Sequence, residues 1–445
     1  MTAASPAGIP QALQAAFEHY QAGRLAEAEA LYREVVRLDP AHADAHANLG
    51  ATLRRRGEPA QAIAACKKAL SLNPAHGRAC HHIANALLDQ GRTAEAVPAY
   101  RQAIALEPQA ADSYNNLAVA LRDLGNIAEA TECCRQALRL APDYADALAT
   151  FADLLLRGGN VAEAAAAARR AAGIPNRARS NERALGRLLA RCGLRDDARM
   201  LFEACLDRDP QDREGIRVAM AQLGLAAAPA AASPAFLEAM YERRSRDWDR
   251  SAAHLDKYRA PRLVAERFLR LPPAAAKPEI LDAGCGTGLL GALVRDAASR
   301  LAGIDLSRPM LEQARAKHLY DELFQEDLVA FMSLRTRSYD VVLSAATFIH
   351  FGDLRPVHEA AANALRDGGW LIFTVFPLAA GADFSVAAID GLALSGCFAH
   401  SRDYLARVAG ASDFELRSME NVIHEYVDGR PVDGLVVALQ RKASP

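Results

Sequence analysis

Ile-Leu-Asp-Ala-Gly-Cys-Gly-Thr-Gly-Leu-Leu-Gly, residues Ile280 to Gly291, is the stretch that decides the fold of the second half of the chain. Its apolar start predicts a short buried strand, and the residues from Leu289 onward return to a helical pattern. Gly284, Gly286 and Gly288 lie between them, and no Cβ there would keep a ligand away from the backbone. A strand, a glycine-rich turn and a helix in this order predict an α/β sheet that binds a nucleotide.

Two acidic residues narrow the class of ligand. A dinucleotide fingerprint would read G-x-G-x-x-G, but here the spacing is G-x-G-x-G and Asp282 precedes the first glycine. A carboxylate at that place would repel a pyrophosphate and could pair with an ammonium group. Asp305 follows the next predicted strand, 17 residues after Gly288, where a carboxylate can accept both ribose hydroxyls. The pair favours a ligand with a cationic amino acid part and a ribose.

From about Phe236 to Lys442 the sequence resembles the class I S-adenosylmethionine-dependent methyltransferases. Besides the glycine turn and Asp305, the landmarks that carry the resemblance are Ser307-x-x-Met310-Leu311, Glu326-Asp327-Leu328, Tyr339 to Ser344 and Leu365 to Trp370. The resemblance implies a Rossmann-like α/β domain with a seven-stranded sheet. It also implies a final antiparallel hairpin formed by Asp413 to Tyr426 and Val432 to Gln440.

The same resemblance implies S-adenosylmethionine as cofactor, with S-adenosylhomocysteine as product. The residues it assigns to the cofactor are Asp282, Gly284, Cys285, Gly286, Gly288, Asp305, Leu306, Met310, Asp327, Leu328, Ser344, Tyr241 and Trp248. Tyr241 and Trp248, together with Asp249, resemble the aromatic and acidic pattern that caps the cofactor. Alternatively, these aromatic side chains only pack their helix onto the sheet.

Two histidines are candidates for catalysis. Methyl transfer is an in-line displacement, which needs a general base only if the nucleophile arrives protonated. His350, just after the predicted fourth strand, lies where the family meets its substrate, and His400 is the second candidate. Each could instead form a pocket wall or a structural hydrogen bond. The segment Pro377 to Gly396 is a candidate lid over the acceptor.

The first half of the chain is repetitive. Glycines recur every 34 residues, at Gly23, Gly57, Gly91, Gly125, Gly159 and Gly193, and alanines keep this period at Ala28, Ala62, Ala96, Ala130, Ala164 and Ala198. This is the period of the tetratricopeptide repeat, a helix-turn-helix unit that buries its apolar face by stacking on its neighbours. We therefore predict an α-solenoid of about six repeats plus a capping helix over residues 10–224, a linker at 225–235 and the methyltransferase domain at 236–445.

Resemblance to tetratricopeptide arrays implies a groove that binds a peptide or protein. The polar residues expected on this face are Asn48, His82, Asn85, Asn115 and Asn116, of which Asn48, His82 and Asn116 share one repeat position. Side-chain amides can pair with the backbone of an extended peptide. The alternative is a solvated groove without a dedicated ligand.

The charge, the apolar runs and the cysteines of the sequence argue against several other classes of protein. The 52 basic and 54 acidic residues give a net charge of −2, which provides no electrostatic case for nucleic acid. No apolar run is long enough for a membrane span and the N-terminus does not read as a signal peptide, so the expected location is the cytoplasm. The eight cysteines form no C-x-x-C pair, and we predict no metal site. The oligomeric state stays open.

The two halves together are similar to a bacterial branch of predicted methyltransferases fused behind tetratricopeptide repeats. Three hypotheses follow. In the first, the repeats recruit a peptide, protein or carrier-bound substrate for the methyltransferase. In the second, the acceptor is a small metabolite and the repeats serve assembly. In the third, the chain is a scaffold with a vestigial methyltransferase domain, against which the intact set of Asp282, Asp305 and the turn glycines argues.

Overall fold

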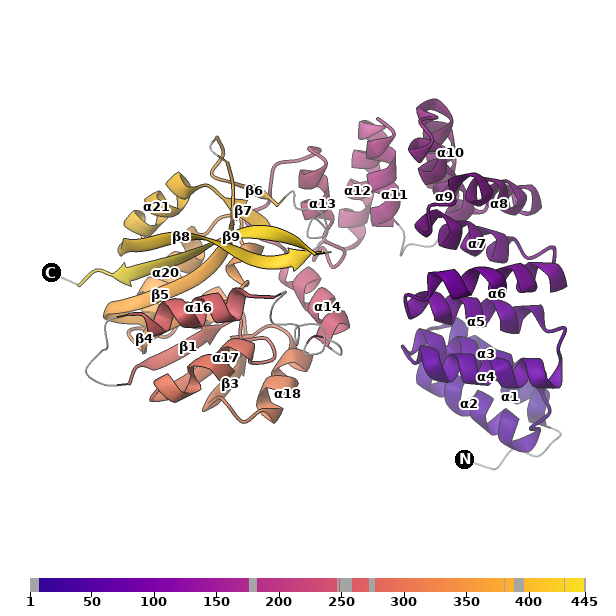
Figure 1. Ribbon diagram of the computed structural model, residues 1–445, viewed down its shortest axis with the longest axis horizontal. Coiled ribbons are helices and arrows are strands. Elements are labelled where there is room, and N and C mark those ends of the chain that lie inside the picture. Colours follow the sequence, from indigo (N-terminus) through magenta and orange to yellow (C-terminus); the bar gives the residue numbers. More distant parts are fainter. Residues whose placement is uncertain are drawn as a thin grey trace. The chain divides into compact units, whose positions relative to one another are not determined.

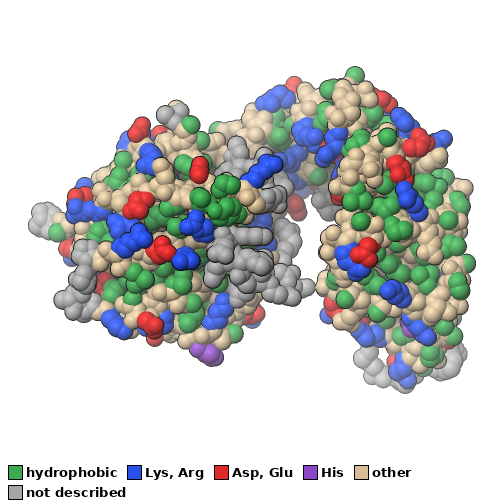
Figure 2. All heavy atoms as spheres, in the orientation of Figure 1, with side chains coloured by type: hydrophobic (Ala, Val, Ile, Leu, Met, Phe, Trp, Pro, Cys, Tyr) green, Lys and Arg blue, Asp and Glu red, His purple; other side chains and the backbone are tan. Residues whose placement is uncertain are grey.

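The structure is a computed structural model, and it describes residues 8–175, 182–245, 248, 258–271, 277–379, 381–387, 396–427 and 429–443. Asp249 and part of the predicted lid, residues 380 and 388–395, lie outside these ranges. The chain divides into two compact units, Met1–Leu201 and Phe202–Pro445 (Figure 1). Basic and acidic side chains are intermixed on the faces seen in Figure 2, in keeping with the nearly balanced charge.

The first unit is built from helix pairs stacked side by side (Figure 1). Its helices are α1 Ile9–Gln21, α2 Leu25–Leu38, α3 Ala43–Arg55, α4 Pro59–Leu72, α5 Gly77–Asp89, α6 Thr93–Leu106, α7 Ala111–Asp123, α8 Ile127–Leu140, α9 Ala145–Arg157, α10 Val161–Gly173, α11 Glu182–Arg191 and α12 Arg195–Arg208, the last of which crosses the boundary between the units. The six periodic glycines each lie between the helices of a pair with φ between +73° and +82°. This backbone conformation explains why glycine recurs there.

The periodic alanines form the contact surface between these helices. All six are at most 1% exposed, so the 34-residue period records buried positions. Gly50 in α3 shows how closely the helices approach, because a Cβ there would lie 2.3 Å from Cys66 Sγ of α4. The stacking predicted from the repeat is therefore present.

The second unit contains a twisted sheet. Its strands are β1 Glu279–Ala283, β2 Arg300–Asp305, β3 Glu322–Gln325, β4 Tyr339–Ser344, β5 Leu365–Pro377, β6 Phe384–Val386, β7 Phe398–His400, β8 Phe414–Val427 and β9 Arg430–Arg441. The strands β3-β2-β1-β4-β5 are parallel in that order, β9 pairs antiparallel with β5, and β8 pairs antiparallel with β9. This is the predicted doubly wound sheet with its final hairpin.

The predicted number of seven strands is not confirmed. In the part of the chain that the structure describes, nine strands join the sheet, because β7 pairs parallel with the end of β5 and β6 pairs antiparallel with β7. Both additional strands have only three residues and fall in or beside the segment that we expected to form a lid. Sequence reasoning missed them because three residues carry no recognisable alternation.

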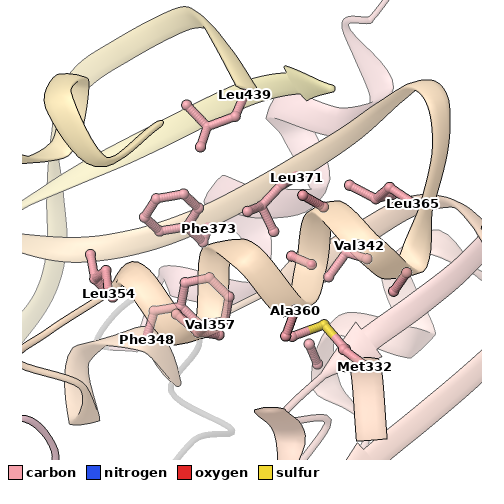
Figure 3. Close-up of a cluster of buried hydrophobic side chains, with 14 of the residues drawn as sticks. Met332, Val342, Phe348, Leu354, Val357, Ala360, Leu365, Leu371, Phe373 and Leu439 are labelled. Atoms are coloured by element: carbon pink, nitrogen blue, oxygen red, sulfur yellow. The ribbon is translucent and has the colours of Figure 1, made fainter. Parts of the chain in front are cut away.

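Helices cover both faces of the sheet. On one face α19 Leu328–Ser333, α20 Arg355–Ala364 and α21 Arg402–Ala411 enclose a core in which Val357 and Ala360 lie against Leu371 and Phe373 (Figure 3). On the other face α16 Ala260–Leu269 and α17 Leu289–Val294 cover residues such as Ile280. Successive residues of a strand point alternately into the two cores. The faces of the sheet are therefore covered, and the carboxyl ends of the parallel strands are the edge at which a ligand can bind.

The chain enters the sheet region through a well-packed segment. Helix α13 (Ile216–Gln222), which we expected to cap the solenoid, lies in the second unit, where Val218 packs with Phe236 of α14 (Pro234–Ser245) and with Phe398. In residues 225–235, the expected linker, the Ala230 carbonyl accepts hydrogen bonds from the amides of Gly352 and Asp353. The amide of Ala232 donates to the His350 carbonyl. The functional domain limits 10–224, 225–235 and 236–445 stay a prediction.

Candidate active site

A pocket opens at the carboxyl ends of β1, β2 and β4, where the predicted nucleotide turn lies. The predicted cofactor residues that line it are Tyr241, Trp248, Asp282, Gly284, Cys285, Gly286, Asp305, Leu306, Met310, Asp327 and Leu328, and His350 lines it as well. They lie in β1 and the turn after it, at the end of β2 and just after it, in α18 (Arg308–Ala316), at the start of α19 and just before it, in α14 and after it, and in the loop after β4. Parallel sheets of this type bind ligands at this edge.

Three of the predicted site residues do not line this pocket. Gly288 begins α17 with φ +89°, and a Cβ there would approach the ring of Tyr320 to 3.1 Å. Ser344 Oγ donates a hydrogen bond of 2.8 Å to the carbonyl of Ala283 and so ties β4 to β1. His400 lies in β7, away from the pocket lining. Their contacts support the fold around the pocket.

Asp305 is held in place by the backbone. Its Oδ2 accepts the amide of Gly286 at 2.9 Å and its Oδ1 accepts the amide of Ser307 at 2.8 Å. Burial raises the pKa of Asp305, and these amides oppose the rise. Each carboxylate oxygen has a second acceptor site, so both can still receive hydroxyl groups of a ribose.

Asp282 is the second carboxyl group of the pocket and, unlike the partly exposed Asp305, it is only 1% exposed. Its Oδ2 accepts the hydroxyl proton of Tyr320 at 2.6 Å. Burial raises the pKa of Asp282 to about 7, although the hydrogen bond from Tyr320 lowers it. None of the described residues that shift this pKa is a cation, and a ligand with an ammonium group would supply one.

The turn between the two carboxylates leaves room for a ligand. A Cβ at Gly286 would meet nothing within 4 Å, whereas a Cβ at Gly284 would lie 2.1 Å from Thr347 Oγ1. Gly284 thus permits close packing on Thr347, and Gly286 leaves the backbone open towards the pocket. An open turn flanked by Asp282 and Asp305 suits the ammonium and ribose groups of S-adenosylmethionine.

Tyr320 is a residue whose role sequence reasoning missed. Besides its bond to Asp282, its ring fills a space bordered by glycines: a Cβ at Gly291 would lie 2.3 Å from its hydroxyl oxygen, and one at Gly303 would lie 2.9 Å from its ring. The signal in the sequence was the presence of glycines outside the ligand turn, in a helix and in a strand. A glycine inside a strand often marks a place where another group approaches closely, and here that group is the ring of Tyr320.

His350 forms a directed chain of hydrogen bonds. Its Nδ1 lies 3.1 Å from the carbonyl oxygen of Gly396, and its Nε2 lies 2.7 Å from the hydroxyl of Tyr241. A carbonyl only accepts, so Nδ1 carries the proton and Nε2 accepts the proton of Tyr241. Burial lowers the pKa of His350 to about 4, with a further contribution from the charge of Arg244. The imidazole is therefore neutral at neutral pH.

Aromatic rings extend from this pair along the pocket wall. Tyr241 and Trp248 meet edge to face with ring centroids 5.8 Å apart, and Trp248 meets Tyr258 in the same way at 5.6 Å. All three rings line the pocket. Edge-to-face contacts of this kind stabilise aromatic clusters beyond the area they bury.

His400 has a different environment. Its Nε2 lies 2.9 Å and 3.1 Å from the carbonyl oxygens of Phe351 and Gly352, and its ring stacks on Tyr404 at 5.9 Å. Burial lowers the pKa of His400 to about 4. These contacts hold the loop after η4 (Phe348–His350), which itself borders the pocket.

The first unit has a pocket of its own. Asn48 and His82 line it, together with aromatic side chains such as Tyr20 and the charged Arg78. Burial lowers the pKa of His82 to about 3, and the charges of His81, Arg54 and Arg78 add to this, so its imidazole is neutral. A neutral imidazole has one nitrogen that donates a hydrogen bond and one that accepts a hydrogen bond, so His82 can pair with either kind of group in this pocket.

The other predicted groove residues do not line this pocket. Asn85 Oδ1 accepts hydrogen bonds from Tyr100 at 2.5 Å and from Asn116 Nδ2 at 3.0 Å. Asn115 Nδ2 lies 3.4 Å from Asn116 Oδ1, and Asn115 is 4% exposed. The expected row of amides is thus divided between a pocket and an internal network.

Among the residues that the structure describes, no three His, Cys, Asp or Glu side chains are placed to hold a metal ion. No helix among these residues has the length and apolar character needed to cross a membrane.

Models of two protein families match the chain. A tetratricopeptide repeat model matches residues 13–76, 83–145 and 121–181, and a methyltransferase domain model matches residues 281–373. Together with the sheet order, these matches define the class: residues 13–181 are tetratricopeptide repeats and residues 281–373 belong to a class I methyltransferase domain. The chain thus joins a repeat solenoid to a methyltransferase domain, as its sequence predicted.

Curated relatives resemble the methyltransferase part. A malonyl-[acyl-carrier protein] O-methyltransferase of Acetivibrio thermocellus is 32% identical over 29% of this chain and 47% of the relative. A ubiquinone biosynthesis O-methyltransferase of Thiobacillus denitrificans is 33% identical over 23% of this chain and 45% of the relative. The chain spans about half the length of the curated relatives it matches.

Solved structures resemble each part weakly. Pseudomonas aeruginosa pilF is 24% identical, with 46% of this chain and 92% of that chain covered at a TM-score of 0.39. An S-adenosylmethionine-dependent methyltransferase from Methanosarcina mazei is 17% identical, with 39% of this chain and 99% of that chain covered at a TM-score of 0.32. Because these TM-scores are low, the assignment of the fold rests on the sheet order and the repeats and not on these two structures.

Proposed function

We propose that the protein is an S-adenosylmethionine-dependent methyltransferase whose tetratricopeptide repeats recruit a polypeptide or a carrier-bound substrate. The observation that carries the cofactor assignment is the pair of carboxyl groups, the buried Asp282 and the partly exposed Asp305, on either side of the open turn at Gly286. The names of the relatives support oxygen as the methylated atom.

Each group in the pocket has a defined task in this proposal. Asp282, held by Tyr320, pairs with the ammonium group, and Asp305 accepts the ribose hydroxyls. The loop at Asp327 borders the adenine. The bound cofactor supplies an electrophilic methyl group. Tyr241 and Trp248 close the pocket from the side of α14, exclude water and orient the acceptor.

Calorimetric titration of S-adenosylmethionine and S-adenosylhomocysteine into the full chain tests the cofactor assignment. We expect binding that Asp305→Ala weakens by a factor of ten or more, about 1.4 kcal/mol. Asp296→Ala, at an exposed carboxylate of η3 (Arg295–Ala297), is the matched control and should bind as the unchanged protein does. Absence of binding to the folded protein would refute the proposal and leave a tetratricopeptide scaffold.

The role of the repeats is a separate part of the proposal. A malonyl-[acyl-carrier protein] O-methyltransferase acts, by its name, on a carrier-bound group, which supports recruitment of a carrier. The second candidate is a small-molecule acceptor with repeats used for assembly, and the ubiquinone biosynthesis relative supports it.

Variants of the groove separate the two candidates. Under recruitment, Asn48→Ala combined with His82→Ala should raise KM for a carrier protein loaded with a hydroxyl-bearing acyl group and leave kcat nearly unchanged. Gln61→Ala, on an exposed position of α4, is the control. An unchanged KM for the carrier, with turnover of a free small molecule, would favour assembly.

A further inference from the structure

The charge of the pocket lining restricts the acceptor. Among the described residues that line it, the charged side chains are all acidic: Glu238, Asp282, Asp305, Glu326 and Asp327. No lysine or arginine belongs to this described lining. An anionic acceptor would therefore enter against the like charges of these described lining residues, which is costly in a partly buried site.

The wall beside the turn restricts the shape of the acceptor. Tyr241, Trp248 and Tyr258 form a continuous aromatic surface through their edge-to-face contacts. Pro261 and Phe351 extend the apolar lining. A flat, apolar carbon skeleton fits such a surface better than a strongly hydrated one.

The hydrogen bonds behind this wall define a direction for proton movement. Tyr241 donates to His350 Nε2, and His350 Nδ1 donates to the Gly396 carbonyl, so no proton of the pair points back into the pocket. A phenol oxygen that donates its proton keeps lone pairs that can accept another hydrogen bond. Tyr241 and His350 both line the pocket, so this hydrogen-bonded pair borders any group that binds there.

We propose that the acceptor is an uncharged hydroxyl group on a flat, apolar skeleton, and that Tyr241 takes its proton while passing its own proton to His350. This rests on the proposed function. As the new carbon–oxygen bond forms, the carbon–sulfur bond of the donor breaks and its electron pair remains on sulfur. The acceptor proton moves to Tyr241 Oη, the Tyr241 proton moves to His350 Nε2, and the positive charge ends on the imidazolium.

The basicity of His350 agrees with a hydroxyl rather than an amine. With its pKa lowered to about 4, the imidazole is too weak a base to take a proton from an alkylammonium ion. A hydroxyl oxygen becomes strongly acidic as it is alkylated, so a weak base suffices at that moment. The carbonyl of Gly396 stabilises the imidazolium that results.

Four probes with the same ring and different acceptor groups test the proposal on the full chain: catechol, 4-nitrocatechol, benzoate and benzylamine. With S-adenosylhomocysteine present, calorimetry should detect binding of catechol and not of benzoate, whereas the benzylammonium ion can bind beside the acidic side chains. With S-adenosylmethionine present, only the catechols should be methylated. Tighter binding of benzoate than of catechol, or methylation of benzoate or benzylamine, would overturn the acceptor assignment.

Two variants test the proton path. At mildly alkaline pH the acidic hydroxyl of 4-nitrocatechol is already ionised, so this anion should bind more weakly beside the acidic lining but needs no base once it is bound. At saturating acceptor, Tyr241→Phe and His350→Gln should therefore lower kcat for catechol by roughly 10²-fold or more, and kcat for 4-nitrocatechol much less. His400→Gln, which disturbs the same loop from outside the pocket, should affect both probes equally. Equal losses for both probes in the first two variants would refute the relay.

The outcome also separates this inference from the proposed function. Loss of S-adenosylmethionine binding in the unchanged protein would count against the proposed function. Retained cofactor binding without methylation of either catechol would overturn only the hydroxyl assignment.

Discussion

At the scale of single residues, the pocket depends on contacts between side chains far apart in the sequence. Tyr320 holds Asp282, and Tyr241 is joined to His350, 109 residues away. The sequence motif predicted the carboxylates and the turn because these lie within one strand-turn-helix unit. It could not predict the tyrosine partners, since their positions depend on how separate elements pack.

Tyr320→Phe tests the contact with Asp282. The ring would still fill the space beside Gly291 and Gly303, but the hydrogen bond to the carboxylate would be lost. A hydrogen bond to a charged group contributes about 1.5–3 kcal/mol, so we expect S-adenosylmethionine to bind roughly ten-fold or more weakly in calorimetry. Tyr339→Phe, at a buried tyrosine outside the pocket lining, is the control. Unchanged affinity in Tyr320→Phe would show that Asp282 needs no such support.

The pKa of Asp282 predicts a pH dependence of cofactor binding. With the pKa raised to about 7, the carboxyl group is largely protonated below pH 7 in the free protein and cannot pair with an ammonium ion. Affinity for S-adenosylmethionine should therefore rise between about pH 5.5 and 7, a range in which the α-amino group stays charged. Titrations across this range should show a flat profile for Asp282→Asn. A flat profile in the unchanged protein would contradict the proposed pairing.

At the scale of elements, the repeats and the main sheet followed from periodic patterns, whereas β6 and β7 did not. The glycine and alanine spacing predicted the helix pairs because each position of a repeat has one fixed environment. The three-residue strands Phe384–Val386 and Phe398–His400 exist because they pair with each other and with the end of β5. Such pairing depends on tertiary structure and leaves no local signal.

The turn after β1 should respond differently to two similar substitutions. Gly284→Ala would place a Cβ 2.1 Å from Thr347 Oγ1 and should lower the melting temperature markedly. Gly286→Ala meets nothing within 4 Å and costs only about 1–2 kcal/mol for its positive φ. It should nevertheless weaken S-adenosylmethionine binding, because the methyl group narrows the open turn. Calorimetric scanning and titration measure both effects, and unaltered binding by Gly286→Ala would place the ligand elsewhere.

Helix contacts in the repeats can be tested at Gly50. In Gly50→Ala the Cβ would lie 2.3 Å from Cys66 Sγ, and overpacking of this kind typically costs about 1–3 kcal/mol. We expect a lower melting temperature, partly restored by adding Cys66→Ala. Gly173→Ala, at a helical glycine whose Cβ would meet nothing within 4 Å, should be neutral or slightly stabilising. If Gly173→Ala lowered the melting temperature as much as Gly50→Ala does, the close contact with Cys66 would not be the cause of the destabilisation.

At the scale of the whole molecule, the two units have separate cores. The clusters around Leu49 and Ala79 lie in Met1–Leu201, and the two sheet cores lie in Phe202–Pro445. The described residues of the proposed cofactor pocket all belong to the second unit. The pocket and the repeats therefore draw their stability from different sets of contacts.

Differential scanning calorimetry should resolve this division. We expect more than one unfolding transition, of which S-adenosylmethionine shifts only the one that belongs to the second unit. At a hundred times its Kd the ligand stabilises that unit by about 2.7 kcal/mol. The matched sample is the Asp305→Ala variant, whose transitions should move less. Equal shifts of all transitions would mean that the chain unfolds as one cooperative body.

The backbone pairing of residues 230–232 with residues 350–353 has a practical consequence. A single proteolytic cut before Ala230 would leave these hydrogen bonds intact. Removal of residues 230–232 would leave the amides of Gly352 and Asp353 and the His350 carbonyl without these partners. Residues 230–232 therefore also hold the backbone of residues 350–353, which include His350, in place. An isolated second unit should therefore begin upstream of Ala230, because a fragment that starts after Ala232 would lose all of these hydrogen bonds.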